Sequence, residues 1–501
     1  MIKKSSINQQ VLFPNPFDVY LDTDNRWIKY SRIIPWKQLE TYYHQHMTAT
    51  MGAPSLDARI VLGAIIIKHH ENLSDEGCIE AIQENMYMQY LLGLPSFKTD
   101  KVFAPSLFTE IRKRLGLDYW QQINDVIISH HTKKNINALN QNNTIENNIT
   151  TDDKPETENN TTSKTLTSAE TPTNEGTLNM DASIIEQDIT YPTDLKILNS
   201  SREKLEQIIN TICIKTGQDK PRTYKNVARR DFLNISKKKN CNAKQIRKGN
   251  GKQLSYVKRD LKYITKLLEK YTDLSDILHH SQLRYLQIIH TVYDQQHYMY
   301  KNKKHQVTDR IVSIHQPHVR PMVRGKAGKN VEFGSKIGVS IHNGLTYIDE
   351  LNWNNYNEAE DLTTSAENYK RRNGYYPAKI NADQKYITKA NRAWCKQRNI
   401  WLSGKPLGRP SEQTKAQHQA LKQSAGERNC VEGKFGQAKR WYINGKIKAR
   451  LSQTSESMIG AVIVVLNLIR LVQQHVHTIL KYYYYLLLKI LINKNAKIAL
   501  F

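Results

Sequence analysis

The chain has 501 residues, with 73 Lys and Arg against 47 Asp and Glu, so its formal net charge is +26. This length allows about two to four domains and a sizeable core, and the charge favours a polyanionic partner, nucleic acid first, although A/T-rich codons could supply part of the lysine. The five scattered cysteines form no C-x-x-C pair, which argues against a disulfide framework or zinc knuckle and indicates a reducing cytoplasm.

The sequence predicts no signal peptide and no membrane anchor. The N-terminal stretch MIKKSSINQQ has no apolar run after its lysines. The most apolar long segment, Ala461 to Leu480, contains Asn467 and Arg470, which suits a buried helix better than a membrane span. The apolar stretch from Tyr482 to Ile492 is too short to cross a bilayer.

Residues 19–121 predict an all-α N-terminal domain. The helical spacing and stop signals place helices over Pro35–His46, over Leu56–His70 with Ser55 as cap, from Asn72 or Ser74 to about Tyr90, and after Ser106. The last of these, LFTEIRKRLG, is amphipathic and basic. Such an arrangement suits a helix-turn-helix DNA reader, and a plain helical bundle accounts for it as well.

The next two segments differ sharply in composition. Residues 132–177 are rich in Asn, Thr, Glu and Ser, which predicts a disordered linker. Apolar residues then alternate around Asp181 in LNMDASIIEQDITYP, which predicts a strand. Its carboxylate is either a satisfied surface group or a metal ligand, and we expect the nearby Asp188 and Asp194 to be turn residues.

Residues 195–300 predict a helical and strongly basic insertion. The expected long helices cover Leu195–Ile214, Leu254–Tyr271 and Leu274–Tyr300, with a turn marked by Gly249, Gly251 and Ser255. The cations expected to contact phosphate in this segment are Arg229, Arg230, Lys237, Lys238 and Lys239. We expect these cations to hold any DNA and the N-terminal domain to recognise its sequence.

Strands are predicted between Arg310 and Trp353. IVSIHQPHV alternates apolar residues, and the following hairpin should turn at Asn343-Gly344. His315 and His318 form an H-x-x-H that lacks the usual third ligand of a metal site. Arg324 lies in a flexible basic loop, where phosphate contact and simple solvation are both plausible roles.

Two further acids occupy positions suited to a site. Asp383 follows the short apolar strand Ala378–Ile380, where it is either a helix N-cap or a ligand group at the end of a strand. The stretch from Gly426 to Arg440 predicts one helix that carries Arg428, Glu432 and Lys439 on one face. The plain alternative is a solvated ion pair on a surface helix.

These motifs together resemble the DDE transposases of bacterial insertion sequences. The spacing Arg428, three residues, Glu432, six residues, Lys439 is similar to the signature around their last acidic residue. In many members a Tyr precedes the Arg by three positions, where Ala425 stands here. The sequence M-D-A-S at Asp181, with the later Y-P-T-D, resembles their first catalytic strand. The N-terminal domain resembles that of the insertion-sequence-five type.

The order of elements predicts a ribonuclease-H-like α/β core over residues 178–473, with the helical insertion after its first strand and a tail at 474–501. The resemblance implies a transposase that binds the inverted repeats of its element, cuts phosphodiester bonds and joins the 3′ ends to target DNA. It implies two Mg²⁺ ions, replaceable by Mn²⁺, held by Asp181, Asp383 and Glu432, with Arg428 and Lys439 on phosphates. It also implies a homodimer or larger assembly on DNA. An inactive or domesticated DNA-binding protein and a nuclease without strand transfer stay open as alternatives.

Overall fold

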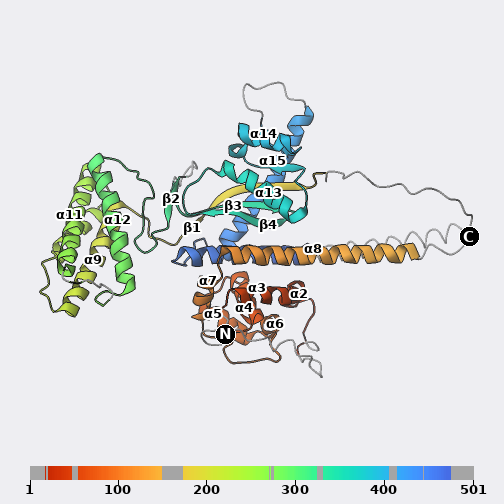
Figure 1. The fold of residues 1–501 in the computed structure, drawn as a ribbon, viewed down its shortest axis with the longest axis horizontal. Coiled ribbons are helices and arrows are strands. Elements are labelled where there is room, and N and C mark those ends of the chain that lie inside the picture. Colours follow the sequence, from red (N-terminus) through yellow and green to blue (C-terminus); the bar gives the residue numbers. More distant parts are fainter. Residues whose placement is uncertain are drawn as a thin grey trace, which may run out of the picture.

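The protein is described from a computed structural model. The described residues are 17, 21–47, 55–148, 173–269, 271, 276–323, 331–405, 415–443 and 445–474, and for 134–148 and 415 the description covers the backbone alone. Figure 1 shows a central sheet with helices on both faces, a helical bundle displaced to one side and a second helical unit beneath. Arg324 and the predicted tail beyond Gln474 lie outside the described residues.

The sheet is mixed, and its first strand is central. The strands are β1 (Thr177–Glu186), β2 (Arg320–Val323), β3 (Val331–His342), β4 (Leu345–Asn352), β5 (Lys379–Asn381) and β6 (Trp401–Leu402). Their order is β2-β3-β1-β5-β6, and β4 also pairs with β3. β1 runs antiparallel to β3 and parallel to β5, which is parallel to β6. The predicted strand around Asp181 is therefore confirmed.

The β3–β4 hairpin turns where the sequence predicts. Asn343 and Gly344 have φ values of 52° and 77°, the two left-handed residues that a type I′ turn requires. The strand predicted over IVSIHQPHV is wrong, because residues 311–319 form no regular element before β2. Its apolar residues Ile311 and Ile314 are buried against the helical insertion instead of facing a sheet.

Helices cover the two faces of the sheet. α13 (Asp361–Asn373) and α14 (Lys389–Gln397) pack on one face, and α15 (Lys415–Gln437) packs on the other with the C-terminal helix Ser452–Gln474. α15 contains the helix predicted from Gly426, but Gly426 lies inside it, because the preceding residues KAQHQALKQSA are good helix formers. α14 begins after its cap Thr388, whose side chain accepts the Asn391 N–H.

The insertion is a helical bundle with its own core. It consists of α9 (Asp194–Thr216), α10 (Lys225–Ser236), α11 (Ala243–Leu268) and α12 (His280–Asn302). The predicted turn at Gly249 and Gly251 is wrong, because both glycines lie inside α11. They permit close helix contacts: a Cβ on Gly249 would lie 3.0 Å from Ile235, and one on Gly251 would lie 2.6 Å from the Tyr300 hydroxyl.

Two local expectations also need correction, one at the start of α9 and one at the start of α4 (Ala58–His70). Asp194 is the first residue of α9, after the capping Thr193, and is no turn residue. In the N-terminal unit Asp57, not Ser55, caps α4, since its carboxylate accepts the Arg59 N–H at 2.8 Å.

The N-terminal unit is all-helical, as predicted. Its helices are α2 (Arg26–Ile33), α3 (Trp36–Gln45), α4 (Ala58–His70), α5 (Asp75–Glu84), α6 (Met86–Leu91) and α7 (Leu107–Arg114). The third predicted helix divides at Asn85, whose side chain accepts the N–H groups of Tyr87 and Met88 and so starts α6. The sequence reasoning did not predict α2.

α8 (Leu117–Asn148) contradicts part of the predicted linker. Residues 132–148 continue this helix, because a helix already nucleated by buried residues such as Tyr119 and Ile127 extends at little cost. The remainder of the predicted linker, residues 149–172, lies outside the described residues.

The predicted boundary near residue 121 does not separate two cores. One apolar cluster contains residues of α2–α8, of β4 and of the C-terminal helix. The Trp120 indole N–H donates to Ser457 Oγ at 3.0 Å, and a Cβ on Gly460 would lie 2.6 Å from the Trp120 Cβ. The C-terminal helix is apolar and long enough to cross a membrane, but 72% of its most apolar window is buried in the protein, as in a core helix.

Candidate acidic site between β1, β5 and α15

The register of two parallel strands places Asp181 and Asp383 at matching positions. β5 pairs with β1 only as far as Asn179, which lies opposite Asn381. Asp181 and Asp383 are each two residues beyond that last pair, where β5 no longer covers the edge of β1. The charge of Asp383 accordingly contributes to raising the pKa of Asp181.

The Asp181 carboxyl is held in a largely enclosed place. Burial raises its pKa above the usual range, and the charges of Asp383 and Glu358 act in the same direction. The Ala182 N–H, which donates to Oδ1 at 2.8 Å, and the Arg428 guanidinium oppose that rise. A carboxylate that needs positive charge to stay ionised is a candidate functional group.

Arg428 of α15 joins two of the three predicted acids. Its Nη1 lies 2.8 Å from Asp181 Oδ2, and its Nη2 lies 3.3 Å from Glu432 Oε1. The Asp181 side chain is 18% exposed and that of Glu432 60% exposed, so the pair of carboxylates extends from the strand to the surface. Fully buried Val431 seats this part of α15 on the sheet.

Lys439 faces the same strand. It lies in the π-helical turn Ala438–Tyr442 at the end of α15, and its ammonium donates to Ser183 Oγ at 2.8 Å. Ser183 is two residues after Asp181 and therefore on the same side of β1. The predicted stripe of Arg428, Glu432 and Lys439 is thus turned toward β1 instead of being a purely solvated face.

The Asp383 carboxylate is open to a ligand. Asp383 precedes a 3-10 turn at Gln384–Tyr386, but its side chain makes no capping hydrogen bond there. Within the part of the chain that the structure describes, it makes no ion pair either. The alternative role of Asp383 as a helix N-cap is therefore not realised.

Sequence reasoning missed Glu358, a fourth acid at this place. It opens the 3-10 turn Glu358–Glu360 between β4 and α13, and its carboxylate pairs with Lys385 at 2.9 Å and with Lys336 at 3.5 Å. The buried Asn391 amide donates to the Ala359 carbonyl at 2.7 Å, and to the carbonyl of Tyr386 in the Asp383 turn at 2.8 Å. No sequence motif indicates Glu358, because its turn comes to lie beside the turn of Asp383 only when the chain folds.

Glu427, the residue before Arg428, has a structural role. Its carboxylate accepts the Lys379 ammonium and the Asn381 amide, each at 2.8 Å. These contacts attach α15 to β5, beside the last strand pair before Asp383. Asp188 is exposed and makes no such connection, which makes it the better control for the candidate acids.

The carboxylate oxygens are hard donors of the kind Mg²⁺ takes, but their present arrangement is not a closed metal site. Among the described residues, no three His, Cys, Asp or Glu side chains lie close enough together to hold a metal ion. Arg428 lies between Asp181 and Glu432, so a metal held by both requires this guanidinium to move. His315 bonds the Tyr285 hydroxyl at 2.8 Å and His318 packs on Trp353, so the H-x-x-H has other partners.

Five of the predicted DNA-binding cations lie on the insertion. An open hollow along α10 is lined by Asn226, Arg229, Arg230, Leu233, Asn234, Lys237 and Lys238. Lys239, just past the helix, is exposed.

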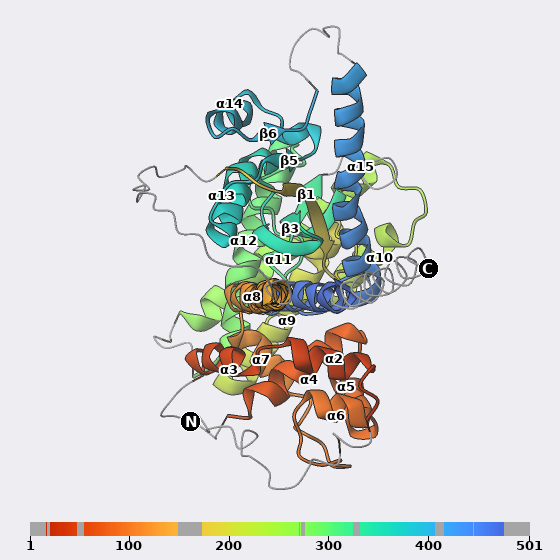
Figure 2. The same cartoon turned by 90° about the vertical axis from the view of Figure 1, so that its right-hand side faces the viewer.

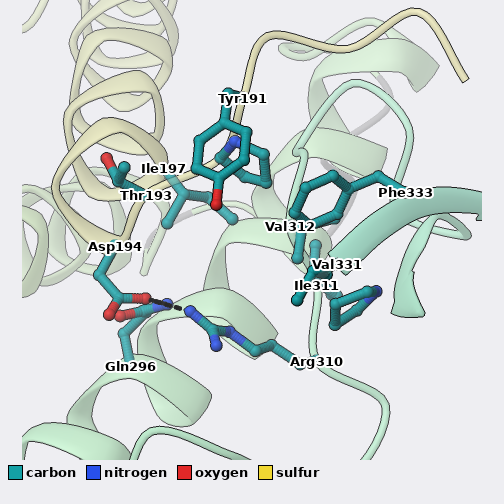
Figure 3. Close-up of a pocket in the computed structure, with 12 residues that line it drawn as sticks. Tyr191, Thr193, Asp194, Ile197, Gln296, Arg310, Ile311, Val312, Val331 and Phe333 are labelled. Carbon is teal, nitrogen blue, oxygen red and sulfur yellow. Dashed lines mark hydrogen bonds and ion pairs between the residues drawn. The ribbon is translucent and has the colours of Figure 1, made fainter. Parts of the chain in front are cut away.

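A separate cavity of about 180 Å³ lies where the insertion meets the sheet (Figure 3). Its floor is the ion pair between Arg310 and Asp194, at 2.6 Å, with the Gln296 amide 2.9 Å from the same carboxylate oxygen. Tyr191 and Phe333 meet edge to face across its rim. None of the candidate acids lines it, so it is distinct from the acidic site.

Comparisons with known proteins find two transposase domains in the chain. Residues 380–469 match the family described as Transposase DDE domain, and residues 15–114 match Transposase domain (DUF772). The first match contains Asp383, Glu432 and Lys439, and the second covers α2–α7. No solved structure matches the chain.

The curated proteins include one partial relative, "Uncharacterized protein ORF8 in nfe locus" of Rhizobium meliloti. It is 26% identical over 113 residues, which are 23% of this chain and 54% of the relative. The chain thus spans about half the length of that relative. The resemblance noted in the sequence is confirmed by the two domain matches.

Proposed function

We propose that this chain, a member of the DDE transposases of insertion sequences, cuts DNA at the ends of its element and joins the 3′ ends to target DNA, using Asp181, Asp383 and Glu432. One observation carries this assignment of the acids. The register of β1 and β5 brings Asp383 beside Asp181, and Arg428, 247 positions after Asp181 in sequence, joins Asp181 to Glu432.

The topology supports a ribonuclease-H-like catalytic core. A central first strand, antiparallel to β3 and parallel to β5 and β6, with helices on both faces, is the arrangement that this assignment requires. The bundle α9–α12 is the insertion after the first strand. We retain residues 178–473 as the catalytic domain and treat the N-terminal domain as docked on it through α8 and the C-terminal helix.

The divalent ions, Mg²⁺ or its substitute Mn²⁺, would be held by Asp181, Asp383 and Glu432. Bound there, they would activate the attacking oxygen and stabilise the leaving oxygen. The chain's own cations have a separate task. Arg428 presents a planar fork that fits carboxylate and phosphate alike, so once released from Asp181 it is placed to bind a DNA phosphate. Lys439, beside Ser183, adds a second cation on the same side of β1.

The partner is DNA, both the element ends and the target, and the protein acts in the cytoplasm on the bacterial nucleoid. A dimer or larger assembly would hold two ends together. The net charge of +26 supports this partner.

A DNA-binding protein that has lost catalysis is the second candidate. The observation that favours it is the lack of a three-acid metal group among the described residues. The two candidates differ in what the acids do, since an inactive protein binds DNA equally well without them.

Amide substitution of the acids tests the proposal. The three variants are Asp181→Asn, Asp383→Asn and Glu432→Gln, which keep the shape of the side chain and remove the charge of the ligand. Each should abolish cleavage and strand transfer of DNA that carries the element ends, in Mg²⁺ or Mn²⁺. DNA binding by gel shift should persist in all three, and Ca²⁺ should support binding without cutting. Asp188→Asn is the matched control and should retain full activity. Full cleavage by Asp383→Asn would reject the site, and cleavage without joining in the unaltered protein would identify a nuclease.

A further inference from the structure

α10 has two faces of opposite character. It is a helix of 12 residues, Lys225–Ser236, which corresponds to a length of about 18 Å. In Figure 2 it lies at the outer edge of the insertion, on the same side of the view as α15. One face packs on α11, and the opposite face carries the residues that line the open hollow.

The inner face is fixed to α11 by specific contacts. Ala228 is fully buried, and its carbonyl accepts the Gln253 amide at 3.0 Å. Asp231 is the only acid of α10, and it pairs with Lys252 at 3.0 Å and accepts the Tyr256 hydroxyl at 2.8 Å. The negative charge is therefore neutralised on the side of α11, and α10 is held as a rigid unit.

The outer face combines cations with neutral recognition groups. Its exposed cations are Arg229, Arg230, Lys237 and Lys238. Among the described residues none of these four makes an ion pair. Asn226, Leu233 and Asn234 lie among them, so the surface is more than a cluster of lysines. Its positive charge is complementary to a DNA backbone.

The basic helix of the N-terminal unit offers less free surface for reading DNA. In α7, Arg112 donates to both carboxylate oxygens of Asp75, at 2.8 and 2.7 Å. Lys113 pairs with Glu110 at 2.8 Å. Arg112 and Lys113 already have partners, whereas the four exposed cations of α10 make no ion pair with any described residue.

We propose that α10 enters the major groove of the DNA duplex and reads base edges through Asn226 and Asn234, with Arg229 and Arg230 beside them. This inference rests on the proposed function and moves sequence recognition from the N-terminal domain to the insertion. The major groove admits one α-helix, and within it Asn pairs with adenine and Arg with guanine in bidentate fashion. Leu233 supplies an apolar contact for a thymine methyl, while Lys237 and Lys238 hold phosphates.

The experiment is a selection from a pool of random DNA duplexes with the full-length protein, followed by sequencing of the bound fraction. The unaltered protein should select a motif. Asn226→Ala and Asn234→Ala, which change no charge, should each lower the preference for that motif over a scrambled duplex about tenfold. Affinity for the scrambled duplex and its dependence on salt should stay the same.

Two further variants make the outcome unambiguous. Arg229→Lys keeps the charge but loses the bidentate fork, so it should also weaken the motif. Asn302→Ala, at an exposed position of α12 in the same bundle, is the matched control and should select the unaltered motif. If both α10 asparagine variants select the original motif with full preference, α10 does not read bases. If the unaltered protein selects no motif, recognition of element ends, and with it the proposed function, is rejected instead.

Discussion

Arg428→Gln tests how the acidic site is held together when no metal is bound. In the structure Arg428 lies 2.8 Å from Asp181 and 3.3 Å from Glu432, and the side chains of Arg428 and Asp181 are 21% and 18% exposed. Exposed ion pairs contribute at most about 1 kcal/mol, and breaking a buried pair costs about 3–5 kcal/mol. For this largely buried pair we expect the free energy of unfolding to fall by about 1–3 kcal/mol at neutral pH.

The loss should depend on pH in a defined direction. The pKa of Asp181 is already raised by burial, and removal of the guanidinium raises it further. When a carboxyl has a higher pKa in the folded than in the unfolded protein, it lowers the stability of the folded state. This cost is absent at pH values below the unfolded pKa, where the carboxyl is protonated in both states. The free energy of unfolding of the variant should therefore approach that of the unaltered protein at pH values below the ordinary pKa of Asp. The variant should become the less stable of the two as the pH rises through the raised pKa of Asp181.

Metal binding should remove the difference in stability between the two proteins. A metal held by Asp181 and Glu432 has to displace Arg428 in the unaltered protein but not in the variant. Mn²⁺ should then bind the variant more tightly, by about tenfold for each 1.4 kcal/mol of contact no longer broken, and raise its Tm more. The assay is thermal unfolding with and without Mn²⁺ in the absence of DNA, with Arg428→Lys as the charge-preserving control. Equal stabilisation of both proteins by Mn²⁺ would refute displacement of Arg428, and lack of any stabilisation would refute the metal site.

Two predictions concern other parts of the chain. Asn467 is buried in the C-terminal helix, where its amide bonds both the N–H and the carbonyl of Thr346, at 2.8 and 2.7 Å. Asn467→Ala leaves the Thr346 N–H without this partner and its carbonyl with only the Asn124 amide at 3.3 Å, and should lower the free energy of unfolding in urea by about 2–4 kcal/mol; a change below about 0.5 kcal/mol would contradict this, as at an ordinary surface site. Alanine at all three lysines of 237–239 should weaken binding to every DNA alike and reduce the salt slope by about two to three units. A changed sequence preference in that triple variant would show that these lysines read bases.

The candidate site residues could be proposed from the sequence because each carries a local signal. Asp181 stands in an alternating strand, Asp383 just past another, and Arg428 and Glu432 are one helical turn apart. What brings them together, the register of β1 with β5, is a long-range property that no local pattern contains. Glu358 illustrates the limit, since its importance arises only from the contact between two distant turns.

The errors in the fold have the same origin. Gly249 and Gly251 are turn signals locally, yet close packing against Ile235 and Tyr300 keeps them in a helix. The apolar pattern in residues 311–319 predicts burial correctly, but buried Ile311 and Ile314 face the helical insertion and not a sheet. The polar residues after position 132 do not indicate that α8, which begins in buried residues, continues through them.

The core shared by the N-terminal unit and the C-terminal helix has a consequence for synthesis on the ribosome. Ile127 and Leu471 belong to the same apolar cluster, so the first unit cannot complete its packing until almost the whole described chain has been translated. At about 5–20 residues per second, its unfilled apolar surface stays open to chaperones for tens of seconds. A copy of the gene interrupted before residue 452 would encode a product that keeps this surface exposed permanently, and quality control would remove that product before it could compete for DNA.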